Sequence, residues 1–245
     1  MKIKLMDKSI NYEFSGTGDV ILFVHGWGGD LHSMDGLYDH FSKNYKCYRL
    51  DLPGFGKSEN PDPDWGIAEY SNLVRLFIDE VIKSKVIYCG HSFGGSIGIY
   101  LAANFKLFKK MILLAPAFRR KGEIKTSFSE KIPLYSKLKP VLYPIRKVGY
   151  SIFYPGSQVL RHPHLEENFK KLVVQTLVPI LHKIDVKTLI IWGDIDVFVP
   201  VKDGYLLHKK LKNSDLRVYK GVNHNIQSAK PEKVIEDITC FLNKK

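Results

Sequence analysis

Short apolar runs, separated by stretches with helical patterns, recur along most of this chain. Six of them are rich in Val, Ile and Tyr: DVILFVHG (19–26), YKCYRLDLPG (45–54), KVIYCG (85–90), KKMILLAP (109–116), KTLIIWGD (187–194) and LRVYKG (216–221). Their apolar character is continuous rather than alternating, which is typical of a strand buried on both faces of a sheet. Helices on both faces bury strands in this way, so the sequence predicts an α/β protein with a doubly wound, mostly parallel sheet.

Helical patterns fill the intervals between these runs. The clearest cover residues 68–83, 94–105, 201–212 and 231–244, and the last begins with Pro231 at a first-turn position that suits proline. Two N-terminal runs, KIKLM and INYEFSG, predict a hairpin at one edge of the sheet. A chain of 245 residues is long enough for one such core.

The alternation of strands and helices stops between Ala117 and Lys187. This segment holds 6 of the 12 prolines and no clean strand pattern, and it is far too long for a plain loop. We therefore predict a core formed by residues 1–116 and 188–245, with residues 117–187 as an inserted, mainly helical cap. The segment carries 14 Lys and Arg against 5 Asp and Glu, which is most of the net charge of +12. It is thus a candidate site for an anionic substrate or carrier, although a Lys-rich solvated surface explains the same composition.

Composition argues against several classes of protein. The chain contains 44% hydrophobic and 25% charged residues, and both fractions are ordinary for a globular domain. The N-terminus lacks the apolar stretch of a signal peptide, and no apolar run is long enough to span a membrane. No nucleic-acid-binding module is evident despite the basic charge. We expect a cytoplasmic protein that acts on a small molecule, and its oligomeric state stays open.

One serine stands in a turn that could make it a nucleophile. The sequence GHSFG (90–94) fits the pattern G-x-S-x-G, in which the serine lies in a sharp turn between a strand and a helix. Only small residues fit beside such a turn, which explains Gly90 and Gly94. A serine in a glycine turn is common by itself, but here an apolar strand pattern precedes Ser92 and an apolar helical pattern follows it. This context favours the nucleophile.

A serine nucleophile needs a base and an acid that orients the base. Of the nine histidines, His224 is the best candidate, because it lies in a loop after the last predicted strand and before the last helix. His25 and His91 belong to the turns around the site and are expected to shape them. Asp194 and Asp196 both follow the strand pattern LIIWG, so either residue qualifies as the acid.

A glycine-rich turn supplies the remaining part of such a site. In HGWGG (25–29) the backbone N–H groups are expected to be free, and the N–H of Trp27 can join that of Phe93 as an oxyanion hole. The same turn could also serve only to change the direction of the chain. The sequence HPH (162–164) lacks the companion ligands of a metal site, and no motif calls for a cofactor.

Taken together, these motifs resemble the α/β-hydrolase superfamily. Five blocks occur in the order typical of that family: HGWGG (25–29), RLDLPGFGKSENP (49–61), GHSFGG (90–95), LIIWGDIDVFVP (189–200) and GVNHNIQSAKPEKV (221–234). The resemblance implies Ser92 as nucleophile, His224 as base, and Trp27 and Phe93 as main-chain oxyanion donors. It also selects Asp196 as the acid, because the family pattern Gly-x-x-Asp with a proline four residues later fits Gly193, Asp196 and Pro200. The 117–187 insertion resembles the family's cap.

The sequence departs from the family at one position. Asn223 precedes His224 where the family usually has glycine, which leaves the shape of that loop undefined. Serine rather than aspartate at position 92 argues against dehalogenase or epoxide-hydrolase chemistry. The expected function is therefore a cofactor-independent serine hydrolase that cleaves a carboxylic ester or thioester with a small, apolar acyl group. The alternatives are acyl transfer, C–C bond hydrolysis or other chemistry of the same triad, and a small-ligand binding module or receptor with a vestigial triad.

Overall fold

A single sheet of eight strands organises the protein. The computed structural model describes residues 1–119 and 162–244. Its strands are β1 (Lys2–Leu5), β2 (Lys8–Ser15), β3 (Val20–Val24), β4 (Lys46–Leu50), β5 (Val86–His91), β6 (Phe108–Leu114), β7 (Thr188–Gly193) and β8 (Ser214–Tyr219). They lie in the order β1-β2-β4-β3-β5-β6-β7-β8. β1 pairs with β2, and β2 with β4, in antiparallel fashion, whereas every other pair is parallel.

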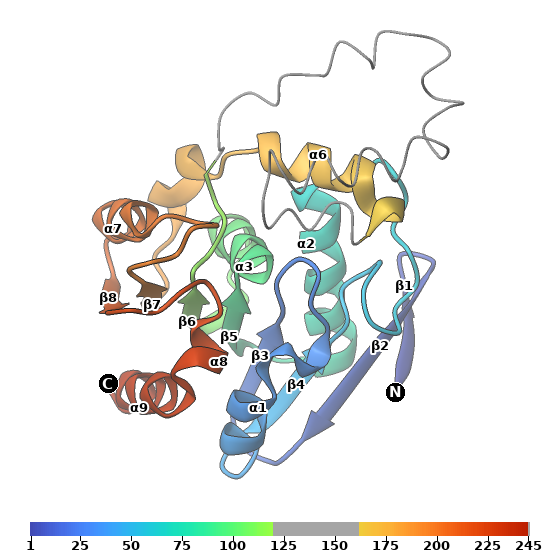
Figure 1. Cartoon of the computed structure of the whole chain (residues 1–245). Coiled ribbons are helices and arrows are strands. Elements are labelled where there is room, and N and C mark those ends of the chain that lie inside the picture. The colour runs from blue at the N-terminus through green and yellow to red at the C-terminus, as the bar shows by residue number, and fades with distance from the viewer. Residues whose placement is uncertain (120–161, 245) are drawn as a thin grey trace, which may run out of the picture.

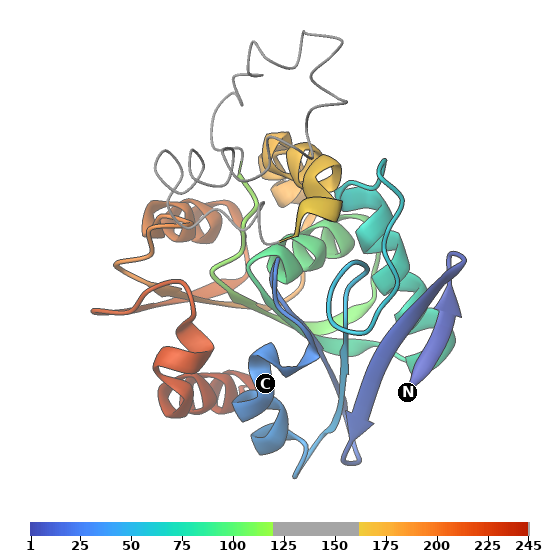
Figure 2. The same ribbon diagram turned by 45° about the vertical axis from the view of Figure 1, so that its right-hand side comes forward.

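Helices cover both faces of this sheet (Figure 1). They are α1 (Asp35–Phe41), α2 (Ile67–Leu76), α3 (Phe93–Asn104), α6 (Glu166–Val174), α7 (Val201–Lys210), α8 (Ile226–Ala229) and α9 (Pro231–Asn243), and shorter helical turns span Leu31–Met34, Phe77–Ile82, Pro163–Leu165 and Val178–Lys183. α1 contacts α8 and α9 on one face, whereas α2 and α3 contact each other on the opposite face, as Figure 2 also shows. The predicted doubly wound, mostly parallel fold is therefore confirmed.

The strand order reverses next to β3. From β3 the chain passes to β4 on one side, and β5 and the following strands are added on the other side. In open α/β sheets, ligands bind at the carboxyl ends of the strands beside such a reversal. The turns after β3 and β5, which hold Trp27 and Ser92, therefore lie where this fold usually carries its site.

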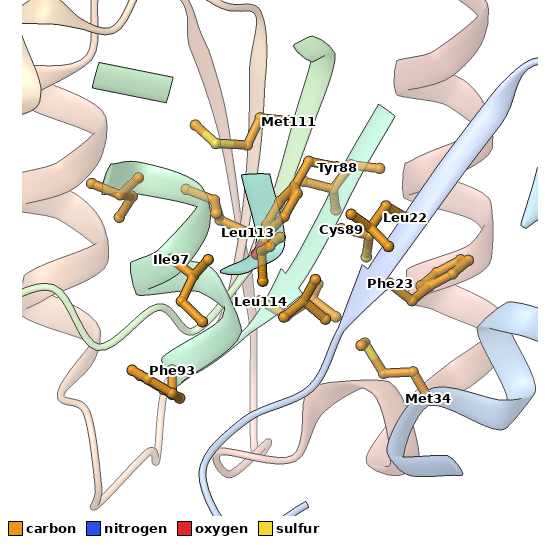
Figure 3. Packing of buried hydrophobic residues seen from close by; sticks show 14 of the residues in the cluster. Leu22, Phe23, Met34, Tyr88, Cys89, Phe93, Ile97, Met111, Leu113 and Leu114 are labelled. Carbon is orange, nitrogen blue, oxygen red and sulfur yellow. The ribbon is translucent and has the colours of Figure 1, made fainter. Parts of the chain in front are cut away.

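The core is formed where helices pack against both faces of the central strands. All six residues of β5 and all six of β7 are buried, in agreement with their continuous apolar sequences. Figure 3 shows that Phe93 and Ile97 of α3 lie on one side of these strands and Met34 on the other. Each fully buried leucine or isoleucine in such a core contributes about 1.5–3 kcal/mol to stability. This packing holds the strand ends, and hence the site, in fixed positions.

Most of the elements predicted from the sequence match the structure. The predicted hairpin is β1 and β2 at the sheet edge, and the predicted helices correspond to α2 with the turn that follows it, α3, α7 and α9. Helix α1 was not predicted, because its seven residues, DGLYDHF, are too short and polar for a clear helical period. Among the described residues, no helix is both long and apolar enough to cross a membrane.

The predicted cap lies largely outside the described residues, which exclude 120–161. Between residues 162 and 187 the structure has α6 flanked by two short helical turns. Asn168 of α6 donates to the carbonyl oxygens of Asp62 and Trp65, at 2.8 and 3.1 Å. α6 is therefore fastened to the loop between β4 and α2. The boundaries of the cap stay a prediction.

Candidate active site

Ser92 occupies a strained turn between β5 and α3. Its φ is +50° and its ψ is −110°, a conformation that L-residues rarely adopt and that costs on the order of 1–3 kcal/mol. A Cβ at Gly90 would lie 2.6 Å from the carbonyl oxygen of Gly94, and a Cβ at Gly94 would lie 2.1 Å from that of Val24. Both positions therefore require glycine, which is the steric reason for the G-x-S-x-G pattern.

A buried tyrosine supports this turn from below. The Tyr88 hydroxyl donates to the carbonyl oxygen of Gly94 at 2.6 Å. Burial raises the pKa of the Tyr88 phenol well above its usual value, so the phenol remains a neutral donor. The backbone N–H of Ser92 donates to Leu114 of the neighbouring strand at 2.9 Å. The serine is thus held by β5, by β6 and by the first turn of α3.

The structure brings Ser92, His224 and Asp196 together, although they come from three separate loops. His224 Nε2 lies 2.9 Å from Ser92 Oγ, and His224 Nδ1 lies 2.6 Å from Asp196 Oδ2. A carboxylate only accepts hydrogen bonds, so Nδ1 carries the proton and Nε2 is free to accept from the serine hydroxyl. The arrangement is a hydroxyl, a base and an acid in series.

The two aspartates after β7 have different environments. The Asp196 side chain is fully buried, and its Oδ1 accepts from the backbone N–H groups of Phe198 and Val199, both at 2.9 Å. Asp194 is exposed, and its Oδ1 accepts from the N–H of Gly221 at 2.7 Å. Only Asp196 therefore contacts the histidine, whereas Asp194 fastens the loop that begins after β8.

The HGWGG turn lies directly against Ser92. A Cβ at Gly26 would be 3.1 Å from the Cβ of Ser92. Within the described part of the chain, neither the N–H of Trp27 nor that of Phe93 has an acceptor. Phe93 is the first residue of α3, where a backbone N–H has no partner inside the helix and attracts negative charge. The two N–H groups are thus available to a developing oxyanion.

His25 fixes the shape of this turn. Its Nδ1 donates to the carbonyl oxygen of Gly26 at 2.7 Å, and its Nε2 accepts from the N–H of Leu52 at 2.9 Å. Burial lowers the pKa of His25, so the imidazole stays neutral and keeps one acceptor nitrogen. His91 contacts the candidate base, since its Nε2 lies 3.0 Å from the carbonyl oxygen of His224. Both histidines are thus hydrogen-bonded to the main chain of the turns around the site, and their roles stay a prediction.

Aromatic rings gather around Trp27. The Trp27 ring lies 5.0 Å from Phe55, 5.7 Å from Phe93 and 5.3 Å from Phe169, measured between centroids and with edge-to-face geometry. Phe55 was not identified as a site residue from the sequence, and Phe169 was only one of several aromatic residues in the 117–187 segment of which a few were expected to line a pocket. The block DLPGFG signals Phe55 only as part of a turn, and no local signal marks Phe169, which reaches Trp27 from α6.

The first charged residue of the 117–187 segment is paired with a carboxylate of the core. Arg119, at the start of the basic segment, forms an ion pair with the buried Asp203 of α7, with 3.0 Å between Nη1 and Oδ1. Arg120 and Lys121 lie outside the described residues. Within residues 1–119 and 162–244, no group of His, Cys, Asp or Glu is arranged to hold a metal ion. The charge of the cap as a binding surface stays a prediction.

Comparisons with known proteins agree with this fold. The sequence profile of the alpha/beta hydrolase fold matches residues 19–139. The chain is 22% identical to the pimeloyl-[acyl-carrier protein] methyl ester esterase of Aliivibrio fischeri, over 97% of this chain and 99% of that protein. It is 25% identical to the 2-hydroxy-6-oxo-6-phenylhexa-2,4-dienoate hydrolase of Comamonas testosteroni, over 94% and 89%.

A solved structure gives the same result for the whole chain. The enol-lactonase from Burkholderia xenovorans LB400 superimposes with a TM-score of 0.80 at 18% identity, covering 100% of both chains. The strand order, the turn after β5 and the sequence profile all lead to one assignment. The chain belongs to the α/β-hydrolase superfamily.

Proposed function

We propose that this protein is a cofactor-independent serine hydrolase that cleaves a carboxylic ester or thioester. The observation that carries the proposal is the hydrogen-bonded series from Ser92 Oγ through His224 to the buried Asp196, with distances of 2.9 and 2.6 Å. A serine becomes a nucleophile when a base removes its proton and an acid holds that base in the right tautomer. The similarity to a methyl ester esterase supports an ester substrate.

The reaction proceeds in two halves. His224 Nε2 takes the proton of Ser92 as the alkoxide attacks the substrate carbonyl, and the N–H groups of Trp27 and Phe93 stabilise the oxyanion. Asp196 stabilises the imidazolium, which then donates its proton to the leaving alcohol or thiol. The product of this half is an acyl-enzyme.

In the second half, His224 Nε2 takes a proton from water as the water attacks the acyl carbonyl. The second oxyanion collapses, the carboxylic acid leaves, and the imidazolium returns its proton to Ser92 Oγ. The enzyme ends in its starting protonation state. No group beyond the residues of this chain and water takes part.

The surroundings of the series support an apolar acyl group. Trp27 carries a proposed oxyanion donor, and its ring contacts Phe55, Phe93 and Phe169. Val197 and Phe198, which follow Asp196 in the sequence, have 83% and 39% of their surfaces exposed, and the Phe198 ring lies 5.6 Å from that of His224. Apolar walls of this kind bind the hydrocarbon part of a ligand and leave its orientation to a few polar groups. We therefore expect esters with an apolar acyl group to be preferred over esters with a charged acyl group.

A burst experiment tests the proposal. With excess p-nitrophenyl ester, the protein should release one equivalent of p-nitrophenol rapidly and then turn over, because the acyl-enzyme forms before water releases it. Ser92→Ala should abolish both phases, with losses of about 10⁴–10⁶ in rate. Ser96→Ala is the matched control, since Ser96 lies one turn along α3 and its hydroxyl bonds the carbonyl oxygen of Ala117. A folded Ser92→Ala variant with unchanged kcat would refute the proposal, and stoichiometric ligand binding without turnover would favour a binding module.

A further inference from the structure

His91 is a buried histidine that the hydrolytic mechanism does not use. It is the last residue of β5, directly before Ser92, and only 6% of its surface is exposed. Its Nε2 lies 3.0 Å from the main-chain carbonyl oxygen of His224, and the two imidazole rings are 4.9 Å apart. A carbonyl oxygen only accepts hydrogen bonds, so the proton of a neutral His91 is on Nε2.

This hydrogen bond connects two parts of the sheet that are far apart. Ser92 follows β5, whereas His224 lies in the loop after β8, and β6 and β7 separate these two strands. The loop is tied to the β7 side by the bond from Gly221 to Asp194 and by the bond from Ile195 to the carbonyl oxygen of Val222. On the β5 side, the bond from His91 holds its main chain.

We propose that His91 is a positioning residue that donates its Nε2–H to the His224 carbonyl oxygen and so sets the distance between His224 Nε2 and Ser92 Oγ. This inference rests on the proposed function of the site. The side-chain bonds to Asp196 and Ser92 orient the imidazole of His224, whereas the bond from His91 acts on the main chain of its loop. The bond from His91 fixes that main chain relative to the strand that carries Ser92.

The protonation of His91 agrees with this role. Burial and the neighbouring His224 lower the pKa of His91 to about 3. The hydrogen bond to the His224 carbonyl oxygen and the charge of Asp196 raise the pKa of His91, and His25 lowers it further, but burial outweighs the groups that raise it. His91 Nδ1 is packed against Gly26, where a Cβ would be 3.0 Å away. His91 therefore stays neutral while His224 accepts and returns the proton of the reaction.

A matched pair of substitutions tests the donor. Glutamine and methionine have similar length, but only glutamine presents an N–H group. His91→Met should lower kcat by about 10- to 100-fold, the size expected when a catalytic group is displaced by roughly 1 Å. His91→Gln should recover most of that loss, and KM should stay nearly constant in both variants because His91 is buried. If both variants lose kcat equally while remaining folded, the donor has no role.

An NMR measurement on the wild-type protein keeps the inference testable even if a variant does not fold. In protein labelled with ¹⁵N,¹³C-histidine, His91 should appear as the neutral Nε2–H tautomer throughout pH 5–9, and its Nε2 should show a coupling across the hydrogen bond to the His224 carbonyl carbon. An imidazolium, or a proton on Nδ1, would overturn the inference. This readout does not depend on turnover. If no ester were hydrolysed, the proposed function would fail, whereas the bond from His91 would be judged separately.

Discussion

Replacing Asp196 with asparagine gives the sharpest test of how the site works. The asparagine oxygen can keep the bonds that Oδ1 accepts from the N–H groups of Phe198 and Val199. Its NH₂ group then takes the position of Oδ2, which in the wild-type protein lies 2.6 Å from His224 Nδ1. Because NH₂ donates, Nδ1 must accept, and the proton of the imidazole moves to Nε2. That nitrogen can no longer take the proton of Ser92.

The expected loss in kcat is about 10⁴-fold, which corresponds to roughly 5 kcal/mol in activation free energy. Asp194→Asn is the matched control, because its oxygen can still accept from Gly221 at the exposed end of the same loop. Its effect on kcat/KM should be about twofold, the size of an ordinary 0.5 kcal/mol surface effect. The assay is hydrolysis of a p-nitrophenyl ester, with circular dichroism to verify folding. Equal losses in the two variants, or a larger loss for Asp194→Asn, would refute the reasoning.

Three further predictions concern the support of the site. Tyr88→Phe should lower the free energy of unfolding in urea by about 1–2 kcal/mol, because the buried carbonyl oxygen of Gly94 loses its donor; a change below about 0.5 kcal/mol would contradict this. Gly94→Ala should lower the free energy of unfolding by about 3 kcal/mol or more, since its Cβ meets backbone at 2.1 Å. Gly36→Ala in α1, where a Cβ meets no atom within 4 Å, should raise the free energy of unfolding by about 0.5–1 kcal/mol, and calorimetry compares the two variants. The pKa of His91 falls from 6.5 in the unfolded chain to about 3 in the folded protein, so between these pH values only the unfolded chain binds the proton. The contribution of His91 to the free energy of unfolding should therefore be complete above about pH 6.5 and should decrease as the pH drops toward 3. Unfolding curves at several pH values should show a smaller acid dependence in His91→Gln.

The parts of this protein that the sequence predicts are those with local causes. A strand buried on both faces must be continuously apolar, and the runs at 85–90 and 187–194 correspond to β5 and β7 for that reason. The turn at Ser92 is recognisable because sterics demand glycine on both sides of it. Helix α1 lacks such a cause in its short, polar sequence, and it forms because Leu37 and Phe41 pack into the core.

Contacts between residues that are far apart in the chain could not be predicted from local sequence patterns. From the residues alone, Asp194 and Asp196 were equal candidates, and a family resemblance selected Asp196. The structure separates them by their partners, since Asp196 turns inward to His224 and Asp194 outward to Gly221. The approach of Phe169 to Trp27 depends on how α6 docks on the loop before α2, which no periodicity in either segment encodes.

The geometry of the site implies that activity can be lost without a loss of stability, whereas weakening the support of the Ser92 turn lowers both. The strained φ of Ser92, which costs on the order of 1–3 kcal/mol, persists because packing around Gly94 and the bond from Tyr88 leave the turn no other conformation. A change in these supports relaxes the turn, so it lowers stability and activity together. A change at the Ser92 hydroxyl removes no such support and leaves the strain in place. Loss of the hydroxyl should therefore abolish turnover while the protein remains about as stable as before.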